Sequence, residues 1–546
     1  MNAALATRTA PPAGRGSSFT GTATLLRFML RRDRVRIPAW AGGLMVFALY
    51  VVTALETVLG DEDLATTAAL FSEPVGRLLT GPGYGFDAPN LERFVAGGYG
   101  LYFLVLTALM SILLVARHTR VEEQTGRAEL VRANVVGRHA VLTATVLTAV
   151  LTNLAVAVLV LVTLVAVGGF ALSGSLLFAV SIALVGLAFA GVTTITVQLS
   201  EYSRAASGLA GAVLGAAFLL RAVGDLPEVG GTALSWVSPL AWGQQTAPFV
   251  LDRLWPLLLL VGFGVATTAV GFAVSRRRDL GASIFAVTPG PARAAPALGT
   301  PWGLAARLQR GTLLGWTAAL AVGGLVFGAY ADALSDAASG LPEAFMELFG
   351  DEDLIAGYLS FMPVFMAYLA AGFVISTVQG LRAEETGGRM EPVLATPISR
   401  ARWLAINVAV AAAGAVVVLV AAGVAAGVGA GIVTGDAGHL GEQALAHLNH
   451  LPAVLVVLGA AALLFGVLPQ AVPITWIFVI YGVFAGTFGP MLDLPQAAAN
   501  LSPFEHAAEV PLEAFTATPL VVLAVVAVVA ASAGVARFRR RDLHTT

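Results

Sequence analysis

Two stretches, Glu122–Arg138 (EEQTGRAELVRANVVGR) and Glu384–Arg400 (EETGGRMEPVLATPISR), are copies of one charged sequence. We call them hairpin 1 and hairpin 2. Each copy lies between two long apolar runs, so the pattern predicts a dense charge cluster held against a membrane face. The shared positions are Glu122, Glu123, Gly126, Arg127, Glu129, Ala133 and Arg138 in hairpin 1, and Glu384, Glu385, Gly388, Arg389, Glu391, Ala395 and Arg400 in hairpin 2.

The apolar runs on either side of the hairpins set the class of the protein. Hydrophobic residues make up 57% of the 546 residues and charged residues 12%, far from the average of soluble domains. Runs of about 20 apolar residues, each long enough to cross a bilayer as a helix, recur along the chain. We therefore expect an all-α polytopic membrane protein with twelve transmembrane helices. The expected spans are 38–59, 96–116, 140–167, 175–199, 205–223, 254–274, 312–331, 355–380, 403–433, 452–469, 471–491 and 517–536.

The distribution of arginine predicts the side of the membrane on which each loop lies. With the N-terminus inside, 27 of the 31 arginines and 10 of the 33 acidic residues fall on the inner side. Cytoplasmic loops are enriched in basic residues, whereas acidic residues have little influence on insertion. Both termini and both hairpins are therefore expected in the cytoplasm.

Further matches indicate that the two halves are a repeat. RRRDL closes the first half at Arg276–Leu280 and the second half at Arg539–Leu543, and DEDL follows spans 1 and 7. Six spans per half give two parallel six-helix repeats, related by an axis along the membrane normal. We expect a first transmembrane domain at 1–280, a linker at 281–303 and a second transmembrane domain at 304–546. The first half carries an extra outer segment at about 65–92.

An amphipathic segment precedes the first span of each half. Leu25–Arg36 (LLRFMLRRDRVR) mixes apolar residues with five arginines, as in a helix that lies on the inner membrane surface with its arginines toward lipid headgroups. A basic flank of span 1 is the alternative. Trp302–Arg310 repeats the pattern before span 7. Polar segments at 236–249 and 500–515 predict short helices or re-entrant turns on the outer side.

The hairpins hold the densest polar chemistry of the chain, and their repetition favours docking of a partner over catalysis. Arginines and carboxylates three or four residues apart can share a helix face, and topology alone would not keep glutamates in register in both copies. For a single copy, a solvated loop that only sets topology is the alternative. The chain has no lysine and no G-x-x-x-x-G-K-[ST] motif, so it lacks the phosphate-binding loop of an ATPase.

Hairpin 2 resembles the charged element between the second and third spans of ABC-type-2 transporter permeases. In that family the element is the coupling helix, which contacts a separate ATP-hydrolysing subunit. The whole chain, as two fused six-span domains, looks like the actinobacterial permeases described as exporters of polyketide antibiotics. The residues of hairpin 2 that carry the resemblance are Arg389, Glu391, Leu394, Thr396, Pro397, Ser399 and Arg400.

Hairpin 1 departs from this pattern at its end. Asn134, Val135 and Gly137 stand where hairpin 2 has Thr396, Pro397 and Ser399. The departure puts the equality of the two docking sites in doubt.

The resemblance implies an ABC-type-2 exporter of type V-like architecture in the bacterial cell membrane. The chain would be the permease subunit, moving hydrophobic or amphipathic small molecules outward, while two copies of a separate nucleotide-binding subunit bind ATP and Mg. It implies no cofactor in this chain and no nucleic-acid partner. The expected docking residues are Glu122, Glu123, Arg127, Glu129 and Arg132 in hairpin 1, and Glu384, Glu385, Arg389, Glu391, Thr396 and Arg400 in hairpin 2.

Aromatic and methionine side chains in the spans are candidates for the substrate cavity, because flexible thioethers and rings adapt to varied amphipathic ligands. Packing between helices or against lipid is the alternative for each of them. The candidates are Tyr99, Phe103 and Met110 in span 2, Phe361, Phe365 and Met366 in span 8, and Phe478 and Tyr481 in span 11.

Three other functions have weaker support in the sequence. An ion-coupled secondary multidrug transporter with two six-span repeats should carry buried ionisable residues, whereas these spans are nearly free of charge. A membrane-embedded enzyme would need catalytic groups at the membrane face. A metal site among His439, Glu442, His447 and His450 lacks a fixed ligand set, so we expect no metal.

Overall fold

The computed structural model describes residues 17–58, 61–278, 283–284, 292–331, 354–488, 494–510 and 512–543. Within these ranges every regular element is a helix. Twelve of the described helices are long and apolar enough to cross a membrane, as the sequence predicts. The chain divides into two compact units, Met1–Pro289 (unit 1) and Gly290–Thr546 (unit 2). Each unit is described by itself.

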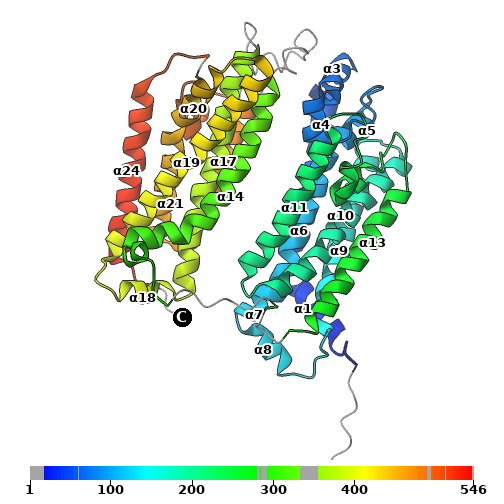
Figure 1. The fold of residues 1–546 in the computed structure, drawn as a ribbon, viewed down its shortest axis with the longest axis horizontal. Coiled ribbons are helices and arrows are strands. Elements are labelled where there is room, and N and C mark those ends of the chain that lie inside the picture. Colours follow the sequence, from blue (N-terminus) through cyan, green and yellow to red (C-terminus); the bar gives the residue numbers. More distant parts are fainter. Residues whose placement is uncertain are drawn as a thin grey trace, which may run out of the picture. The chain divides into compact units, whose positions relative to one another are not determined.

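The described part of unit 1 contains six helices that could span a membrane and several short ones. Figure 1 shows how the long helices lie side by side. Its core surrounds α10, which packs against α6, α9, α11 and α13. Phe103 of α6 is fully buried there, with its ring 4.8 Å from Phe47 and 5.6 Å from Phe178 between centroids. The elements are α1 Thr22–Arg32, α2 Arg36–Val58, α3 Asp61–Ser72, α4 Pro74–Thr80, α5 Leu91–Phe94, η1 Val95–Tyr99, α6 Gly100–Ala116, η2 Arg117–Val121, α7 Glu122–Gln124, α8 Arg127–Arg132, α9 Ala140–Ala166, α10 Leu172–Leu199, α11 Ser203–Asp225, η3 Ser235–Val237, α12 Pro239–Gln244 and α13 Trp255–Ser275.

Unit 2 is held together by close contacts between helix backbones. A Cβ at Gly324 or Gly328 of α14 would collide with carbonyl oxygens of α19, and one at Gly466 of α21 would collide with the backbone of α24 at Gly534. Small residues allow such close approach in membrane helices. The elements are η4 Pro296–Gly299, α14 Pro301–Ala329, α17 Leu354–Thr386, α18 Met390–Leu394, α19 Arg400–Thr434, α20 His439–Asn449, α21 Leu451–Val467, η6 Pro469–Thr475, α22 Trp476–Phe488, α23 Gln496–Ala499, η7 Pro503–His506 and α24 Ala517–Arg540.

The entry segments of the two units differ. In unit 1 the amphipathic α1 ends at Arg32, because Asp33 is buried in ionic contacts with Arg117 and His118 and the chain turns there before α2. In unit 2 the expected separate helix over 302–310 does not form, and α14 runs unbroken from Pro301 to Ala329. Its start is fixed by Thr300, whose side chain accepts from the Gly303 amide at 3.1 Å.

The extra segment of unit 1 is helical in its first part, where α3 and α4 lie, and non-helical from 81 to 90. Helix α4 packs against α3 and against the end of α11, and two arginines connect it to α11. Arg77 donates to the Asp225 carbonyl at 3.0 Å, and Arg221 donates to the Leu78 carbonyl at 2.5 Å. Arg221 and Asp225 are both fully buried and 3.4 Å apart, so this end of unit 1 is tied together by a buried ion pair.

Candidate functional site

The two hairpins have the same backbone geometry. After the first helical turn a glycine adopts the left-handed conformation, with φ of 71° at Gly126 and 68° at Gly388, which glycine reaches at no steric cost. A second short helix follows, α8 or α18. In α8 the last turn is closed by the Ala133 amide, which donates to the Glu129 carbonyl at 2.9 Å. In α18 the Ala395 amide donates to the Glu391 carbonyl at 2.9 Å. The repeated sequence therefore folds twice into one local structure.

The second glutamate of each hairpin is bound to the last arginine of the RRRDL sequence in its own unit. The Arg278 guanidinium donates to both carboxylate oxygens of Glu123, at 2.6 and 2.8 Å. Arg541 donates to Glu385 at 2.8 Å. All four side chains are at most 12% exposed. Each hairpin is thus joined to the end of the sixth span of its unit by a charge-assisted bond.

In unit 1 this ion pair is part of a larger network. Arg120, fully buried in η2, also binds Glu123 at 2.7 Å, and its Nε donates to the Val197 carbonyl of α10 at 2.9 Å. Arg278 donates through Nε to the Gln198 side chain at 2.6 Å. The first glutamate, Glu122, pairs with Arg32 of α1. Hairpin 1 is therefore fastened to α1, α10 and α13 at once.

In unit 2 the fastening is simpler. Arg541 lies over the rings of Phe465 and Phe538, 5.5 and 5.3 Å from their centroids, which is the geometry of cation–π attraction. The Arg400 side chain donates to the Arg541 carbonyl at 2.8 Å. Glu384 pairs with Arg389 at 2.9 Å within the hairpin itself.

The ends of the hairpins show why hairpin 1 departs from hairpin 2. Ser399 caps α19 by accepting from the Arg402 amide at 3.2 Å. At the equivalent place in hairpin 1 the Gly137 amide donates to the Thr20 carbonyl, and the His139 amide donates to the Ser18 carbonyl, both at 2.9 Å. A Cβ at Gly137 would collide with the Ser18 backbone. The N-terminal segment thus takes the place of the serine cap and requires glycine.

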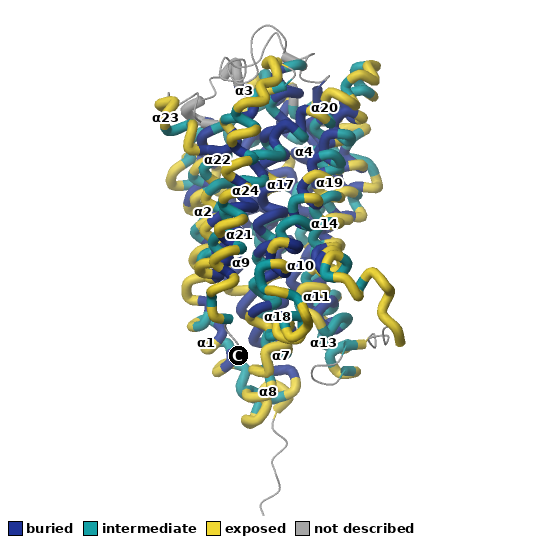
Figure 2. The backbone as a smooth tube through the Cα atoms, turned by 90° about the vertical axis from the view of Figure 1, so that its left-hand side faces the viewer, coloured by how far each residue is buried: buried dark blue, intermediate teal, exposed yellow. Residues whose placement is uncertain are grey.

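The hairpin residues named from the sequence fall into two groups. The exposed group consists of Arg127, Glu129 and Arg132 in hairpin 1, and Arg389, Glu391 and Thr396 in hairpin 2. Most of α8 is coloured as exposed in Figure 2. Glu122, Glu123, Glu384, Glu385 and Arg400 are partly or fully buried in the ion pairs and hydrogen bonds described above. The first group has side chains that are accessible at the surface of its own unit, and the second group holds the hairpins in place.

The cavity candidates from the sequence lie in different environments. Phe103, Met110 and Met366 are at most 1% exposed and pack inside their own units. The other five are half-buried: Tyr99, Phe361, Phe365, Phe478 and Tyr481. Their contact with a substrate stays a prediction.

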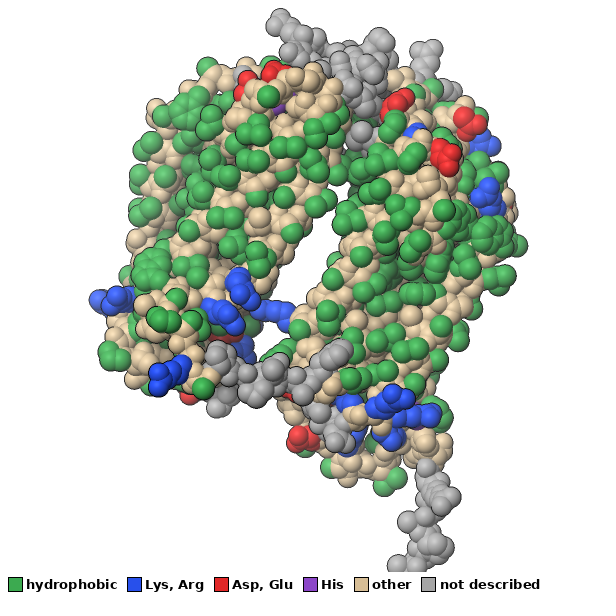
Figure 3. Space-filling view, viewed as in Figure 1, with side chains coloured by type: hydrophobic (Ala, Val, Ile, Leu, Met, Phe, Trp, Pro, Cys, Tyr) green, Lys and Arg blue, Asp and Glu red, His purple; other side chains and the backbone are tan. Residues whose placement is uncertain are grey.

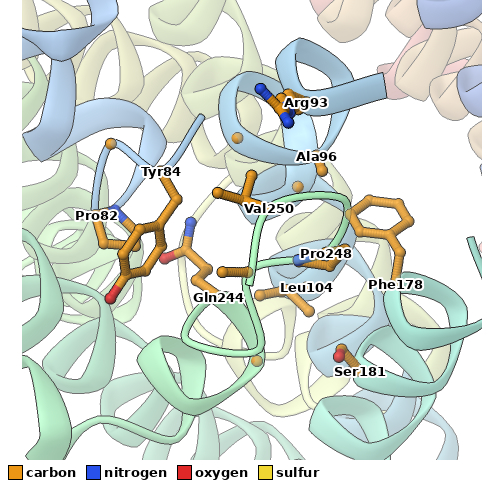
Figure 4. Close-up of a pocket in the computed structure, with 15 residues that line it drawn as sticks. Pro82, Tyr84, Arg93, Ala96, Leu104, Phe178, Ser181, Gln244, Pro248 and Val250 are labelled. Atoms are coloured by element: carbon orange, nitrogen blue, oxygen red, sulfur yellow. The ribbon is translucent and has the colours of Figure 1, made fainter. Parts of the chain in front are cut away.

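A small cavity lies at the other end of unit 1 from the hairpin. Tyr84, Gln244 and Pro248 from loops and a short helix face it together with Leu104 and Phe178 (Figure 4). Its volume of about 30 Å³ matches a single water molecule. The cavity is too small for a drug-like ligand.

The residues weighed as a metal site, from which we expected no metal, lie on α20 and at its end. His439 contacts Glu442 at 3.3 Å, whereas His447 and His450 are buried in α20 and at the start of α21. Across the described ranges no group of three potential metal ligands comes together.

Comparison with known proteins finds a matching family model for each half of the chain. Residues 35–247 match the family model of the ABC-2 type transporter, and residues 298–539 match the C-terminal domain of the multidrug efflux system permease Rv1217c. Over 551 aligned residues the chain is 37% identical to the multidrug efflux system permease protein Rv1217c of Mycobacterium tuberculosis (strain ATCC 25618 / H37Rv). The match covers 98% of each chain.

Proposed function

The chain belongs to the family of ABC-2 type transporter permeases, and we propose that it is the membrane subunit of a multidrug efflux system driven through its two hairpins. It is a transmembrane subunit without an ATPase domain, so the energy comes from a separate protein. This assignment replaces the alternative of an ion-coupled secondary transporter. The observation that carries the proposal is the attachment of each hairpin to the sixth span of its unit by a buried Arg–Glu pair.

The topology proposed with it has six spans per unit in the same orientation. Both termini and both hairpins lie in the cytoplasm, because the arginines concentrate on that side. Several arginines of unit 1 lie at the end that carries the hairpin (Figure 3). Two copies of an ATP-hydrolysing subunit then dock, one on each hairpin.

The mechanism follows from the contacts of the hairpins. The exposed group, which includes Arg127 and Glu129 or Arg389 and Glu391, receives the partner. The buried pairs pass its displacement to α13 and α24, since a bidentate or stacked arginine resists sliding. Access to the substrate then alternates between the two sides. The substrates are hydrophobic or amphipathic small molecules, in line with the name of the relative.

The proposal is tested by reconstituting the permease in liposomes with and without its ATPase subunit. ATP-dependent export of an amphipathic fluorescent dye is expected only with both proteins. A catalytically dead ATPase serves as the matched control. Export that persists without the ATPase, or that a proton gradient alone can drive, would overturn the proposal.

A further inference from the structure

At the hairpin end of unit 1, a cavity of about 540 Å³ lies between α1, hairpin 1 and the ends of α10 and α13. This volume is in the range of small-molecule sites. Leu25, Phe28 and Met29 of α1 form one wall, and Val141 and Leu142 of α9 continue the apolar lining. The cavity therefore offers apolar surface beside the most charged part of the unit.

The charged lining of this cavity is positive in sum. Arg32, Arg132, Arg138 and Arg278 face two glutamates, Glu122 and Glu123. Arg32 and Arg278 are bound to those glutamates. This leaves Arg132 and Arg138, both exposed, as charges that no carboxylate neutralises among the described residues. Arg138 makes one hydrogen bond to a backbone carbonyl, that of Arg276.

The corresponding cavity of unit 2 gives an internal comparison. It has nearly the same volume, about 510 Å³, and lies between the start of α14 and hairpin 2. Its lining contains one charged residue, Arg402, next to apolar and small side chains such as Leu304, Pro397 and Trp403. The two cavities thus occupy equivalent places but differ in charge.

We propose that the cavity of unit 1 binds the phosphate group of one anionic phospholipid, with an acyl chain along Phe28 and Leu142. Guanidinium groups bind phosphate through two parallel hydrogen bonds, and basic residues near an anionic leaflet attract its headgroups. The exposed arginines Arg27 and Arg31 of α1 continue the positive surface outward. The site belongs to the inner leaflet, which rests on the topology of the proposed function.

The test measures binding alone, so its result is independent of ATPase docking and transport. The purified full-length permease is titrated with dioleoyl phosphatidylglycerol or dioleoyl phosphatidylcholine in detergent, and retained lipid is counted by native mass spectrometry. We expect one phosphatidylglycerol to be retained in preference to phosphatidylcholine. The double variant Arg132→Gln/Arg138→Gln should weaken that retention on the order of tenfold. Arg132→Gln alone, at an exposed position, should lose part of it without affecting folding.

The matched control is Arg307→Gln/Arg310→Gln on α14, two exposed arginines outside the lining of the unit 2 cavity. It should retain phosphatidylglycerol as the parent does. Equal retention of the two lipids, or full retention by the double variant of unit 1, would overturn the proposal. Displacement of the lipid by millimolar inorganic phosphate would also overturn it, because the site would then be one for soluble phosphate.

Discussion

Arg278 and Glu123 lie 155 positions apart in the chain, yet their side chains form a two-point ion pair with N–O distances of 2.6 and 2.8 Å. Arg541 and Glu385 form the equivalent contact in unit 2. Each pair joins a hairpin to the end of the last span in its unit. Each hairpin is therefore in direct electrostatic contact with a span to which it is not adjacent in the chain.

The first prediction concerns this pair in unit 1. Glu123→Gln should lower the stability of the permease by about 3 kcal/mol, because Arg278 and Arg120 lose their charged partner in a buried place. The variant should transport less substrate per ATP hydrolysed, while its affinity for the ATPase subunit should change less. The double variant Glu123→Gln/Arg278→Gln should lose less stability in a thermal melt than the sum of the two single variants, because neither side chain is then a buried unpaired charge. Strictly additive losses would show that the pair does not act as a unit.

The second prediction concerns the inequality of the hairpins. Hairpin 1 has further attachments to Arg32, to Val197 through Arg120, and to the N-terminal segment. Hairpin 2 is attached through Arg541, which binds Glu385 and whose carbonyl accepts from Arg400. Glu385→Gln should therefore loosen hairpin 2 more than Glu123→Gln loosens hairpin 1. Hydrogen exchange of the amides of α18 and α8 measures this directly. Equal increases in the two variants would contradict the inequality.

The third prediction uses the close contact at Gly137. Gly137→Ser copies hairpin 2 into hairpin 1, and the added Cβ would collide with the Ser18 backbone. The segment at residues 17–21 should detach and exchange its amide hydrogens faster. Gly208→Ala, where a Cβ meets nothing within 4 Å, is the matched control. If the amides of this segment stay protected in Gly137→Ser, the inference that the segment replaces the serine cap is wrong.

The fourth prediction concerns pH. Burial, together with the charges of Arg276 and Arg138, lowers the pKa of His139, which contacts Phe19 and Phe272. The folded state therefore takes up this proton at a lower pH than the unfolded state, whose histidine takes it up below about pH 6.5. The stabilisation is present above that pH and declines as the pH falls below it.

A melting-temperature series from pH 7.5 to pH 5.5 checks this prediction. The parent should lose more stability than His139→Gln, which carries no titrating ring. An identical loss in both proteins would assign the pH dependence to other groups.

Much of the fold could be predicted from the sequence because the length of an apolar run is a local property. The twelve spans follow from runs of about 20 apolar residues, and α13 (Trp255–Ser275) lies within one residue of its expected span at 254–274. The breaks were harder to predict. The start of α14 depends on the cap at Thr300, and the end of α1 depends on contacts of Asp33 with the distant Arg117.

The candidate site could be predicted only in part for the same reason. The repeated register identified the hairpin residues, but it could not separate exposed Glu129 from Glu123, whose partner Arg278 is far along the chain. The RRRDL repeat was visible as a sequence match, and a search for an acidic residue repeated at an offset within one position of it would have suggested the pairing. The buried Arg221–Asp225 pair gives no such signal. From the sequence alone Arg221 is expected at the membrane interface, whereas in the structure α4 covers it.

We propose that the ATPase subunit docks on both hairpins. The chain contains no cysteine, so single cysteines at exposed hairpin positions, Glu129→Cys and Glu391→Cys, can be crosslinked to the partner without background. We predict crosslinks to the ATPase subunit from both positions. Val229→Cys, exposed at the other end of unit 1, should give none. Failure of both hairpin cysteines to crosslink in an actively transporting complex would contradict the account.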